Sequence, residues 1–302
     1  MGRYSCRVAT TNDVPTVYDL LNEYVVEQGL EEEFTNSKQA FSDHHERELF
    51  TAIITEVTDE AENKTEIIGC AFISFPYNYI VGTCGFIHCC YVKPSHRDRG
   101  LQQMLLKMLK KVAAEKGTHF MMGSVCGKDH IFDSALEAEG LIDMATLPSG
   151  ASDLWFMANP STTPEFSSDD YVVREGSFKD LDDVYDLCNE LMKFEKIEEH
   201  RPANFTKEVF SHDGGLDDPP YGAIVVEHRR RVDDEENEVR PDIVGCILYT
   251  KMYHTLRGDT YWLQGLYISP QHTGKGLGKP LVRASLEVII YPLLSLFLLH
   301  AE

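Results

Sequence analysis

The sequence predicts an α/β protein made of two tandem copies of one domain. Three observations lead to this fold class. The chain repeats itself, both halves place strand-like and helix-like segments in the same order, and each half has a strand that runs through a loop into a helix. Strand runs interspersed with helices are typical of α/β domains. A chain of 302 residues also has the length of about two domains.

The repeat shows as identical residues at nearly constant spacing. Segment Val17–Glu23 recurs as Val184–Glu190, an offset of 167 positions counted from residue 17 to residue 184, with one mismatch. An offset of 176 relates a second set of pairs: Gly69-Cys70 and Gly245-Cys246, Tyr91 and Tyr267, Pro94 and Pro270, His96 and His272, Gly100-Leu101 and Gly276-Leu277. The larger offset implies a net insertion in the second copy, most of it in the charged segment His228–Asp242. A duplicated domain explains this order and spacing better than chance.

The first copy is expected to start with a strand and an amphipathic helix. Val17, Leu20, Leu21 and Tyr24 follow the spacing of one helical face. The expected elements are strands at Ser5–Ala9, Leu49–Val57, Ile67–Phe75, Phe86–Val92 and His119–Val125, and a long helix at Gly100–Glu115.

The second copy is expected to reproduce this order. Its strands are expected at Tyr171–Arg174, Gly222–Glu227, Ile243–Thr250 and Tyr261–Ile268, and its long helix near Gly276. Asp13 and Asp180 lie near the starts of the two first helices and are expected to act as N-caps. Residues 1–159 and 171–302 are expected to be domains, joined by a linker at 160–170 that is rich in Pro, Ser and Thr. Segment Arg229–Glu238 is expected to be a solvated loop or hairpin tip.

The composition excludes several classes of protein. A net charge of −21 argues against nucleic acid and anionic membranes as partners. The same charge suits a cationic amine substrate, or it simply keeps the protein soluble. No pair among the eight cysteines has CxxC spacing, so no metal site is expected. No apolar run follows Met1, so the chain is expected to be cytoplasmic with reduced thiols.

Two apolar segments are expected to be buried. Cys89 and Cys90 lie in an apolar run and are expected to pack as small hydrophobic residues. Segment Val288–Leu299 contains Pro292 and is shorter than the roughly 20 residues that a membrane span needs. It is therefore expected to be a buried helix end followed by a core strand.

The most informative segments are the two strand–loop–helix junctions, Tyr91–Gln102 and Tyr267–Gly278. Successive backbone N–H groups that open onto a helix N-terminus form a cradle for phosphate, and glycines let the backbone approach a ligand closely. Arg97, Arg99 and Lys275 can add positive charge. The GxxxxGK[ST] and GxGxxG patterns are missing, which argues against a P-loop and a dinucleotide fingerprint. A plain strand-to-helix turn is the alternative.

These junctions resemble the Arg/Gln-x-x-Gly-x-Gly/Ala loop of the GNAT acetyltransferases. The second copy resembles the spermidine/spermine (diamine) N-acetyltransferases: Glu190–Glu195 is similar to their first helix, Leu263–Ile268 to their central strand and Leu296–Glu302 to the next strand. The resemblance covers nearly all of residues 171–302 and, more loosely, 3–158. It implies two GNAT-type domains, each a mixed, mostly antiparallel sheet with splayed central parallel strands flanked by helices.

Acetyl-CoA is the cosubstrate that the resemblance implies, held between the splayed strands with its pyrophosphate on the loop amides. The implied binding residues are Tyr91, Val92, Arg97, Asp98, Arg99, Gly100, Leu101 and Gln102 in the first copy, and Tyr267, Ile268, Thr273, Gly274, Lys275, Gly276, Leu277 and Gly278 in the second. Two positions depart from the family pattern. Thr273 replaces the expected Arg or Gln, and Gln102 replaces a small residue and would crowd the pyrophosphate.

Acetyl transfer to a primary amine needs a general base, because such an amine is mostly protonated at neutral pH, with a pKa of about 10. The family places a Glu on the central strand for this task. His88 stands there in the first copy, and Gln264, which cannot act as a base, in the second. His88 is therefore the candidate catalytic residue, and a hydrogen-bonded structural histidine is the alternative. The family's acid is a Tyr in the following helix, here Asp129–Gly140, where Leu136 stands instead.

Phe194 and Glu195 are the candidate substrate-binding residues by resemblance, since a desolvated carboxylate binds an ammonium well; an ordinary solvated Glu is the alternative. The offset pairs Glu302 with residue 126, so the second copy is expected to be truncated at its C-terminus, or the ending to be an alternative terminus of a longer form.

The leading interpretation is an acetyl-CoA-dependent N-acetyltransferase that acts on a small primary amine, such as a polyamine or a related amino compound. The alternative is a catalytically impaired module that binds acetyl-CoA or serves as a scaffold. The resembled diamine enzymes are dimers, so a homodimer and pairing of the two copies within one chain both remain open.

Overall fold

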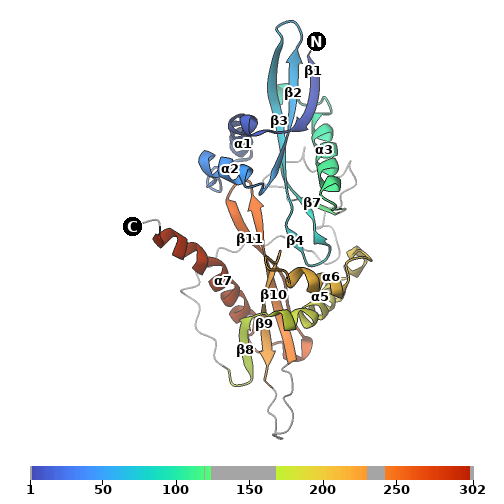
Figure 1. Cartoon of the computed structure of the whole chain (residues 1–302), viewed down its shortest axis with the longest axis vertical. Coiled ribbons are helices and arrows are strands. Elements are labelled where there is room, and N and C mark those ends of the chain that lie inside the picture. Colours follow the sequence, from blue (N-terminus) through green and yellow to red (C-terminus); the bar gives the residue numbers. More distant parts are fainter. Residues whose placement is uncertain (1, 119, 124–167, 230–241, 300–302) are drawn as a thin grey trace. The chain divides into compact units, whose positions relative to one another are not determined.

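The computed structural model describes residues 2–118, 120–123, 168–229 and 242–299 (Figure 1). The chain divides into two compact units, and each unit contains a short segment from the other copy. Unit 1 consists of Met1–Pro76, Thr83–Met144 and Met252–Thr260, and unit 2 of Tyr77–Gly82, Ala145–Lys251 and Tyr261–Glu302.

Unit 1 is built around a five-stranded sheet with the order β1-β2-β3-β6-β7. Its elements are β1 (Arg3–Val8), α1 (Val14–Gln28), α2 (Lys38–Glu46), β2 (Thr51–Asp59), β3 (Lys64–Ser74), β6 (Gly85–Val92), α3 (Leu101–Glu115) and β7 (Met121–Gly123). Strands β6 and β7 are parallel, and the other neighbours are antiparallel. This confirms the mixed, mostly antiparallel sheet expected for the first copy.

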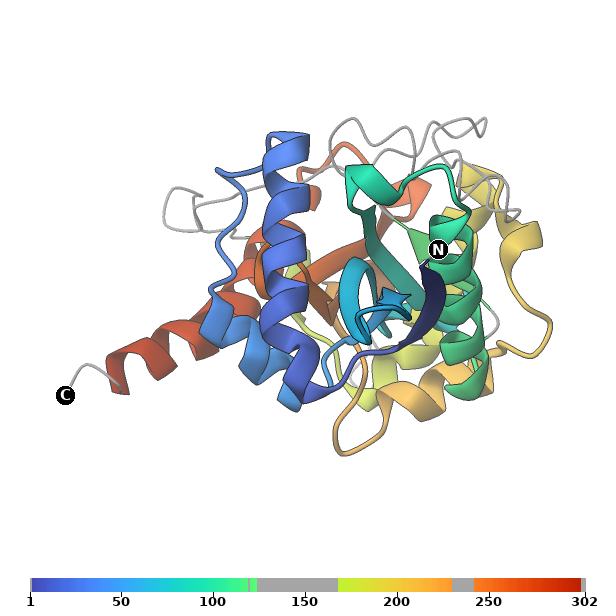
Figure 2. The same cartoon turned by 90° about the horizontal axis from the view of Figure 1, so that it is seen from above.

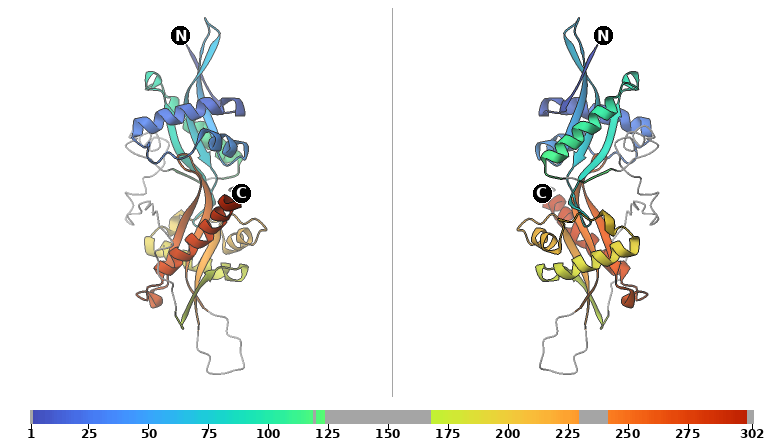
Figure 3. Two further views of the ribbon diagram at one scale, coloured as in Figure 1. Left: turned by 90° about the vertical axis from the view of Figure 1, so that its left-hand side faces the viewer. Right: turned by 90° about the vertical axis from the view of Figure 1, so that its right-hand side faces the viewer.

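Helices cover both faces of the sheet in unit 1. Figures 2 and 3 show α1 and α3 on opposite sides of the strands. One hydrophobic cluster joins Leu21 of α1 and Phe41 of α2 to the sheet, and another joins Leu105 of α3 to the opposite face. Cys89 and Cys90 are buried, as expected.

Unit 2 contains a four-stranded sheet with the order β11-β10-β9-β8. Its elements are β8 (Tyr171–Glu175), α5 (Leu181–Glu195), α6 (Lys207–Gly214), β9 (Gly222–His228), β10 (Asp242–His254), β11 (Gly258–Ile268) and α7 (Gly278–Leu299). Leu191 of α5 and Phe210 of α6 belong to one cluster, and Leu281 of α7 to another. The helices therefore again flank the sheet, with α7 and α5 facing the viewer in the two halves of Figure 3.

The tips of two hairpins are exchanged between the copies. Residues 77–82, which include β4 (Tyr77–Asn78), follow β3 in sequence but belong to unit 2. Residues 252–260, which comprise the end of β10, the turn after it and the start of β11, belong to unit 1. In the offset of 176, Gly82 corresponds to Gly258, and both adopt positive φ angles, 78° and 80°. The two tips therefore turn in the same way, each inside the unit that the other copy dominates.

The two copies also share the same β-bulge. In β3 the residue left without a cross-strand partner is Ile68, and in β10 it is Val244, 176 positions later. The Lys93 amide donates to the Ile68 carbonyl at 2.9 Å, and the Ser269 amide donates to the Val244 carbonyl at 2.9 Å. A bulge bends its strand and re-aims the side chains around it, so the duplication extends to the local shape of the sheet.

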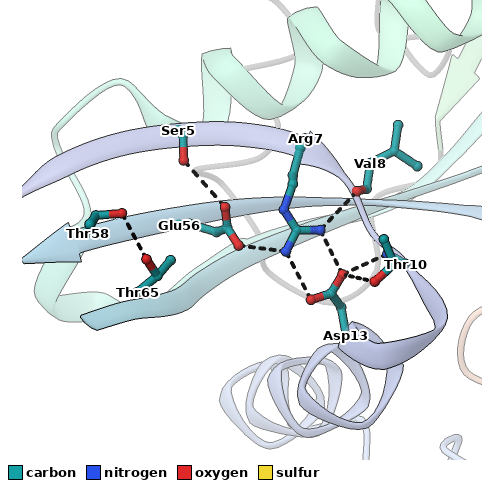
Figure 4. Close-up of polar contacts among 8 residues, drawn as sticks. All are labelled: Ser5, Arg7, Val8, Thr10, Asp13, Glu56, Thr58 and Thr65. Atoms are coloured by element: carbon teal, nitrogen blue, oxygen red, sulfur yellow. Dashed lines mark hydrogen bonds and ion pairs between the residues drawn. The ribbon is translucent and has the colours of Figure 1, made fainter. Parts of the chain in front are cut away.

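Each copy ties its first strand to its first helix through an arginine. The Arg7 guanidinium contacts Asp13 and Glu56 at 2.7 Å each (Figure 4). The counterparts in unit 2 are Arg174, Asp180 and Glu227, with both contacts at 2.8 Å. Hydrogen bonds from Arg7 hold the pKa of Asp13 well below its usual range.

Asp13 and Asp180 stand at the N-cap positions of α1 and α5, as expected, but their side chains do not cap these helices. The side chains instead close short 3₁₀ turns that lead into α1 and α5 and whose own N-caps are Thr10 and Ser177. The Thr10 amide donates to Asp13 and the Ser177 amide donates to Asp180, at 2.7 Å each. This reciprocal arrangement is a capping box, in which the carboxylate occupies the third position of the turn.

The expectation of a strand after Val288 was wrong, because α7 continues to Leu299. The first copy shows the reason. Helix α3 ends at Glu115, and Gly117, two residues later, has a φ of 76° that lets the chain turn away from the helix. The position 176 residues later is Leu293, a strong helix former without that freedom. The expected helix Asp129–Gly140 and nearly all of the linker and the charged loop lie outside the described residues.

None of the described helices combines the length and the apolar character that a bilayer crossing needs.

Candidate active site

The loops between β6 and α3 and between β11 and α7 have the same backbone conformation. Asp98 and Gly100 have φ angles of 61° and 73°, and their counterparts Gly274 and Gly276 both have 74°. These are left-handed conformations, which favour glycine and which Asp tolerates better than most residues. The two loops therefore adopt left-handed backbone conformations at the same two positions before each helix begins, in agreement with the match between the two junction sequences.

The amides at the start of α3 are available for an anion. The first four N–H groups of a helix have no partner within the helix, and the N-cap, Gly100, has no side chain to satisfy them. The space around the loops is open: a Cβ on Gly100 would meet only Gln103 Oε1 at 3.9 Å, and a Cβ on Gly276 would meet nothing within 4 Å. Amides and open space together suit a phosphate group.

The parallel strands β6 and β7 form a short described pairing. Their pairing covers Gly85, Phe86 and Ile87 of β6, opposite Met121, Met122 and Gly123. β6 continues to Val92 with β3 on its other side. Among the residues that the structure describes, no strand pairs with this outer part of β6 on the side of β7.

A small cleft lies where this edge meets the loop. Its lining consists of Tyr24, Glu27, Gln28, Cys90, Tyr91, Val92, Arg97 and Gln102. Four of the predicted cofactor-binding residues, Tyr91, Val92, Arg97 and Gln102, therefore come together. Leu101 belongs instead to the hydrophobic core, with 2% of its surface exposed, so only its backbone can face a ligand.

Both arginines of the first loop already have partners. Arg97 Nε donates to the Val92 carbonyl at 2.9 Å, and Arg97 Nη2 donates to Glu27 at 2.6 Å. Arg99 donates to the Tyr4 hydroxyl, and its guanidinium lies 5.7 Å from the centre of the Tyr4 ring. The Val92 carbonyl and the adjoining cleft are thus occupied by Arg97, which has to move before a ligand can pair with that carbonyl.

The second junction lies beside a different hollow. A cavity of about 460 Å³ is lined by Asp183, Asp242, Ile243, Val244, Ser269, Gln271 and His272. None of the predicted residues Tyr267, Ile268 or Thr273–Gly278 lines it. Thr273 Oγ1 donates to the Pro270 carbonyl at 2.8 Å, and Lys275 Nζ lies 5.7 Å from the Tyr171 ring centre. Leu277 is buried like Leu101.

His88 lies in a bulge of β6, directly after Ile87, the last residue of β6 that pairs with the described part of β7. Ile87 pairs with Ile73 and Cys90 pairs with Ala71, so two residues of β6, His88 and Cys89, oppose one residue of β3. The His88 side chain is buried, with 3% of its surface exposed. A bulge next to an active site is a common way to re-aim a side chain.

The imidazole of His88 has one hydrogen-bond partner among the described residues. Its Nε2 lies 2.8 Å from Ser74 Oγ, and its Nδ1 is buried without a hydrogen-bond partner. Burial lowers the pKa of His88 well below 6.5, and the nearby His254 lowers it further. His88 is therefore neutral at pH 7, and its ring can accept a proton or a hydrogen bond from a ligand.

Gln264, the counterpart of His88, holds the exchanged tip 77–82. Its Nε2 donates to the Tyr77 carbonyl at 2.8 Å, and its Oε1 accepts from the Tyr79 amide at 3.2 Å. Arg201 Nη2 donates to the Tyr79 carbonyl at 3.0 Å. These bonds place the tip over the strand position that would carry a base.

The two candidate substrate-binding residues point to different surroundings. Phe194 is 78% exposed. Glu195 accepts a hydrogen bond from the Tyr79 hydroxyl at 3.2 Å, so its carboxylate is tied to the exchanged tip.

One family model matches residues 14–129 and 181–290, that of the acetyltransferase (GNAT) family. The chain belongs to this family. It is 26% identical to the thialysine N-epsilon-acetyltransferase of Bos taurus, over 39% of this chain and 67% of the relative. It is 27% identical to that of Mus musculus, over 39% and 66%. The chain thus spans about two thirds of the length of these relatives. Family and relatives support N-acetyltransferase activity.

A solved structure of a predicted acetyltransferase with acetyl-CoA from Clostridium acetobutylicum is 18% identical, with a TM-score of 0.40. The match covers 54% of this chain and all of that chain.

Sequence reasoning missed two features of the GNAT site. It predicted the two loops and His88 as candidates, but it did not find the bulge at His88 or the exchange of the hairpin tips. The matching tip residues Tyr77 and Tyr253, and Gly82 and Gly258, extend the offset of 176. They were a signal that the tips are equivalent, although not that each belongs to the other unit. In the part of the chain that the structure describes, no group of three or more His, Cys, Asp and Glu side chains could hold a metal.

Proposed function

We propose that unit 1 transfers the acetyl group of acetyl-CoA to a small primary amine, with His88 as the proton acceptor. The observation that carries this proposal is the position of His88 on β6, directly after the last described pair with β7, Ile87 and Gly123, and on the strand that leads to the open loop at Gly100. The outer edge of β6 can take the extended part of the cosubstrate, and the amides of α3 can take its pyrophosphate.

The chemistry follows from the groups at this point. Acetyl-CoA supplies an acetyl group on a thioester. The amine nitrogen forms a bond to the acetyl carbon, the carbon–sulfur bond breaks, and the sulfur leaves as the thiolate of CoA. The ammonium loses one proton before its nitrogen attacks, and His88 Nδ1 is the acceptor we assign for it. The second proton, which the nitrogen loses once the new bond has formed, passes to the CoA thiolate and gives the free thiol. His88 serves as a base when Nε2 carries the hydrogen and donates it to Ser74 Oγ.

A binding role is the second candidate, for unit 2. Gln264 cannot accept a proton at neutral pH, and both ends of its amide hold the tip 77–82. The loop at Gly274 and Gly276 nevertheless has the backbone of the first loop. Unit 2 is therefore proposed to bind acetyl-CoA, or to serve as a scaffold, without turnover.

Release of free thiol from acetyl-CoA tests the proposed activity. The full-length protein is incubated with thialysine, lysine, spermidine and 1,4-diaminobutane in turn. Release with at least one amine supports the proposal. An increase in melting temperature with acetyl-CoA but no release would leave only the binding role. If acetyl-CoA gives neither thiol release nor an increase in melting temperature, both candidates are contradicted.

The variant His88→Gln tests the assigned base. The amide can still contact Ser74 but cannot accept a proton at neutral pH, so kcat/KM is expected to fall by about 10²–10⁴-fold. The control is His212→Gln, because His212 is 74% exposed in unit 2. Unchanged kcat/KM in a stable His88→Gln protein would remove His88 from the reaction.

A further inference from the structure

The tip 252–260 is firmly anchored inside unit 1. The Tyr253 ring stacks on Phe50 with centroids 4.3 Å apart and planes 17° apart. Asn36 Nδ2 donates to the Tyr253 hydroxyl and to the Thr255 carbonyl, both at 3.0 Å. The backbone amide of Asn36 donates to the Leu256 carbonyl at 3.0 Å. These contacts fix the tip as part of unit 1.

This anchoring brings His254 to His88. The two rings are 5.9 Å apart at an angle of 81°, edge to face, and the His254 side chain is 7% exposed. The Leu256 amide donates to His254 Nδ1 at 3.3 Å. A nitrogen that accepts a hydrogen bond carries no proton, so neutral His254 has its hydrogen on Nε2.

The tip in unit 2 shows that the turn itself does not need a histidine. Asn78 is the counterpart of His254 in the offset of 176. Its Oδ1 accepts from the Ile80 amide at 2.8 Å, just as His254 Nδ1 accepts from Leu256. An Asn side chain that bonds the amide two residues on is a common turn device. Because Asn suffices for the turn, the imidazole of His254 has a use beyond it.

We propose that His254, which the second copy contributes to unit 1, is a positioning residue that packs against His88 and keeps its ring dry and neutral for proton transfer. This inference rests on the function proposed above and deepens it. The second copy then acts as a built-in partner for the first: it completes the surroundings of His88, while its own strand position is held by Gln264.

The titratable groups packed around His88 lower its pKa and do not raise it. His254 and Tyr253 face His88 from β10, Phe86 faces it from β6, and Ser74 from β3. Burial and, to a smaller extent, the charge of Arg257 on the tip together lower the pKa of His254 to about 4. The burial of Tyr253 raises its pKa well above its ordinary value, so it stays neutral. Only the two imidazoles in this group can gain charge, and each disfavours protonation of the other.

The variant His254→Asn tests the proposal, because it copies the solution seen at Asn78. The turn is retained and the imidazole is lost. Water then reaches His88 and the second imidazole no longer opposes its charge, so the pKa of His88 rises toward 6.5. Because a base works only when unprotonated, kcat/KM at about pH 6 relative to about pH 8 is expected to fall about threefold. The matched control, Asn78→Ser in unit 2, is expected to leave this ratio unchanged.

A readout that does not depend on turnover separates the two proposals. In protein labelled with ¹³C-histidine, the His88 signal is assigned by its loss in His88→Gln and is titrated with pH. The midpoint of His88 is expected to rise in His254→Asn, even if no amine releases thiol. Absence of thiol release in the wild type would count against the proposed function alone.

An unchanged midpoint and an unchanged pH profile would overturn the role of His254. If His254→Asn does not fold, His254→Ser replaces it, since a hydroxyl also bonds the amide two residues on. The same rise in the midpoint is expected of His254→Ser, and its absence has the same meaning.

Discussion

Gln264 and Tyr79 are joined by a hydrogen bond from the Tyr79 amide to Gln264 Oε1 at 3.2 Å, while the other end of the same amide group bonds the Tyr77 carbonyl at 2.8 Å. The Gln264 side chain on β11 thus forms hydrogen bonds with the backbone of the tip 77–82, which comes from the first copy. In its counterpart His88, one ring nitrogen is hydrogen-bonded and the other is buried without a hydrogen-bond partner. The duplication therefore gave one strand position two different tasks.

The variant Gln264→Ala is expected to lower the free energy of unfolding by about 2–4 kcal/mol, because it leaves two buried backbone groups without partners. Urea denaturation followed by circular dichroism measures this loss. The control Gln271→Ala changes an exposed side chain and is expected to stay within about 0.5 kcal/mol of the wild type. A loss no larger than in the control would mean that the Gln264 side chain does not hold the tip 77–82.

The paired glycines after the bulge are predicted to differ in their tolerance of a methyl group. A Cβ on Gly69 would lie 2.6 Å from Thr55 Oγ1 and 2.7 Å from the Tyr91 carbonyl, whereas a Cβ on Gly245 would lie 3.0 Å from the Tyr267 carbonyl. Gly69→Ala is therefore expected to cost about 1–3 kcal/mol, as overpacking does, and Gly245→Ala less. Melting temperatures of the two variants compare the costs. Equal temperatures would contradict the close approach at Gly69.

Asp180 is predicted to add stability that acid removes. Burial alone would raise its pKa, but hydrogen bonds from Arg174 and Ser177 outweigh this and lower the pKa from 3.8 to about 2. A carboxyl whose pKa is lower in the folded state stabilises above its unfolded pKa, and this stability is lost as pH falls through the folded value.

The loss should therefore fall between about pH 4 and pH 2. Asp180→Asn is expected to reduce stability at pH 7 and to flatten the pH dependence in that window. Asp19→Asn, at a side chain that is 66% exposed, serves as the control. An unaltered slope in Asp180→Asn would count against the role of the ion pair.

Much of this fold was predictable because the repeat constrains it. The spacing of identical residues predicted that the two strand–loop–helix junctions are equivalent, and the matching left-handed conformations at Gly100 and Gly276 agree with that equivalence. Local patterns could not reveal the tip exchange, because which unit a turn packs into depends on distant contacts such as that of Asn36 with Tyr253. The end of α7 was mispredicted because the family resemblance suggested a strand where Leu293, in place of a glycine, lets the helix continue.

The candidate site was predictable in its loops but not in its chemistry. The strand position of His88 followed from the resemblance, while its burial, its bond to Ser74 and its contact with His254 arise from packing. The assigned base and the cofactor residues therefore stay predictions until they are measured.

The central claim is that the loop at Gly100 holds the diphosphate of acetyl-CoA. Gly100→Asp places a carboxylate there, and Gly100→Asn places a neutral amide of the same shape; both residues tolerate a left-handed φ. Calorimetric titration of the full chain with acetyl-CoA measures the affinity of each variant. The affinity of Gly100→Asp is expected to be about tenfold or more below that of Gly100→Asn, because the added carboxylate repels the phosphates. Equal affinities for the two variants, with turnover intact in both, would contradict the claim.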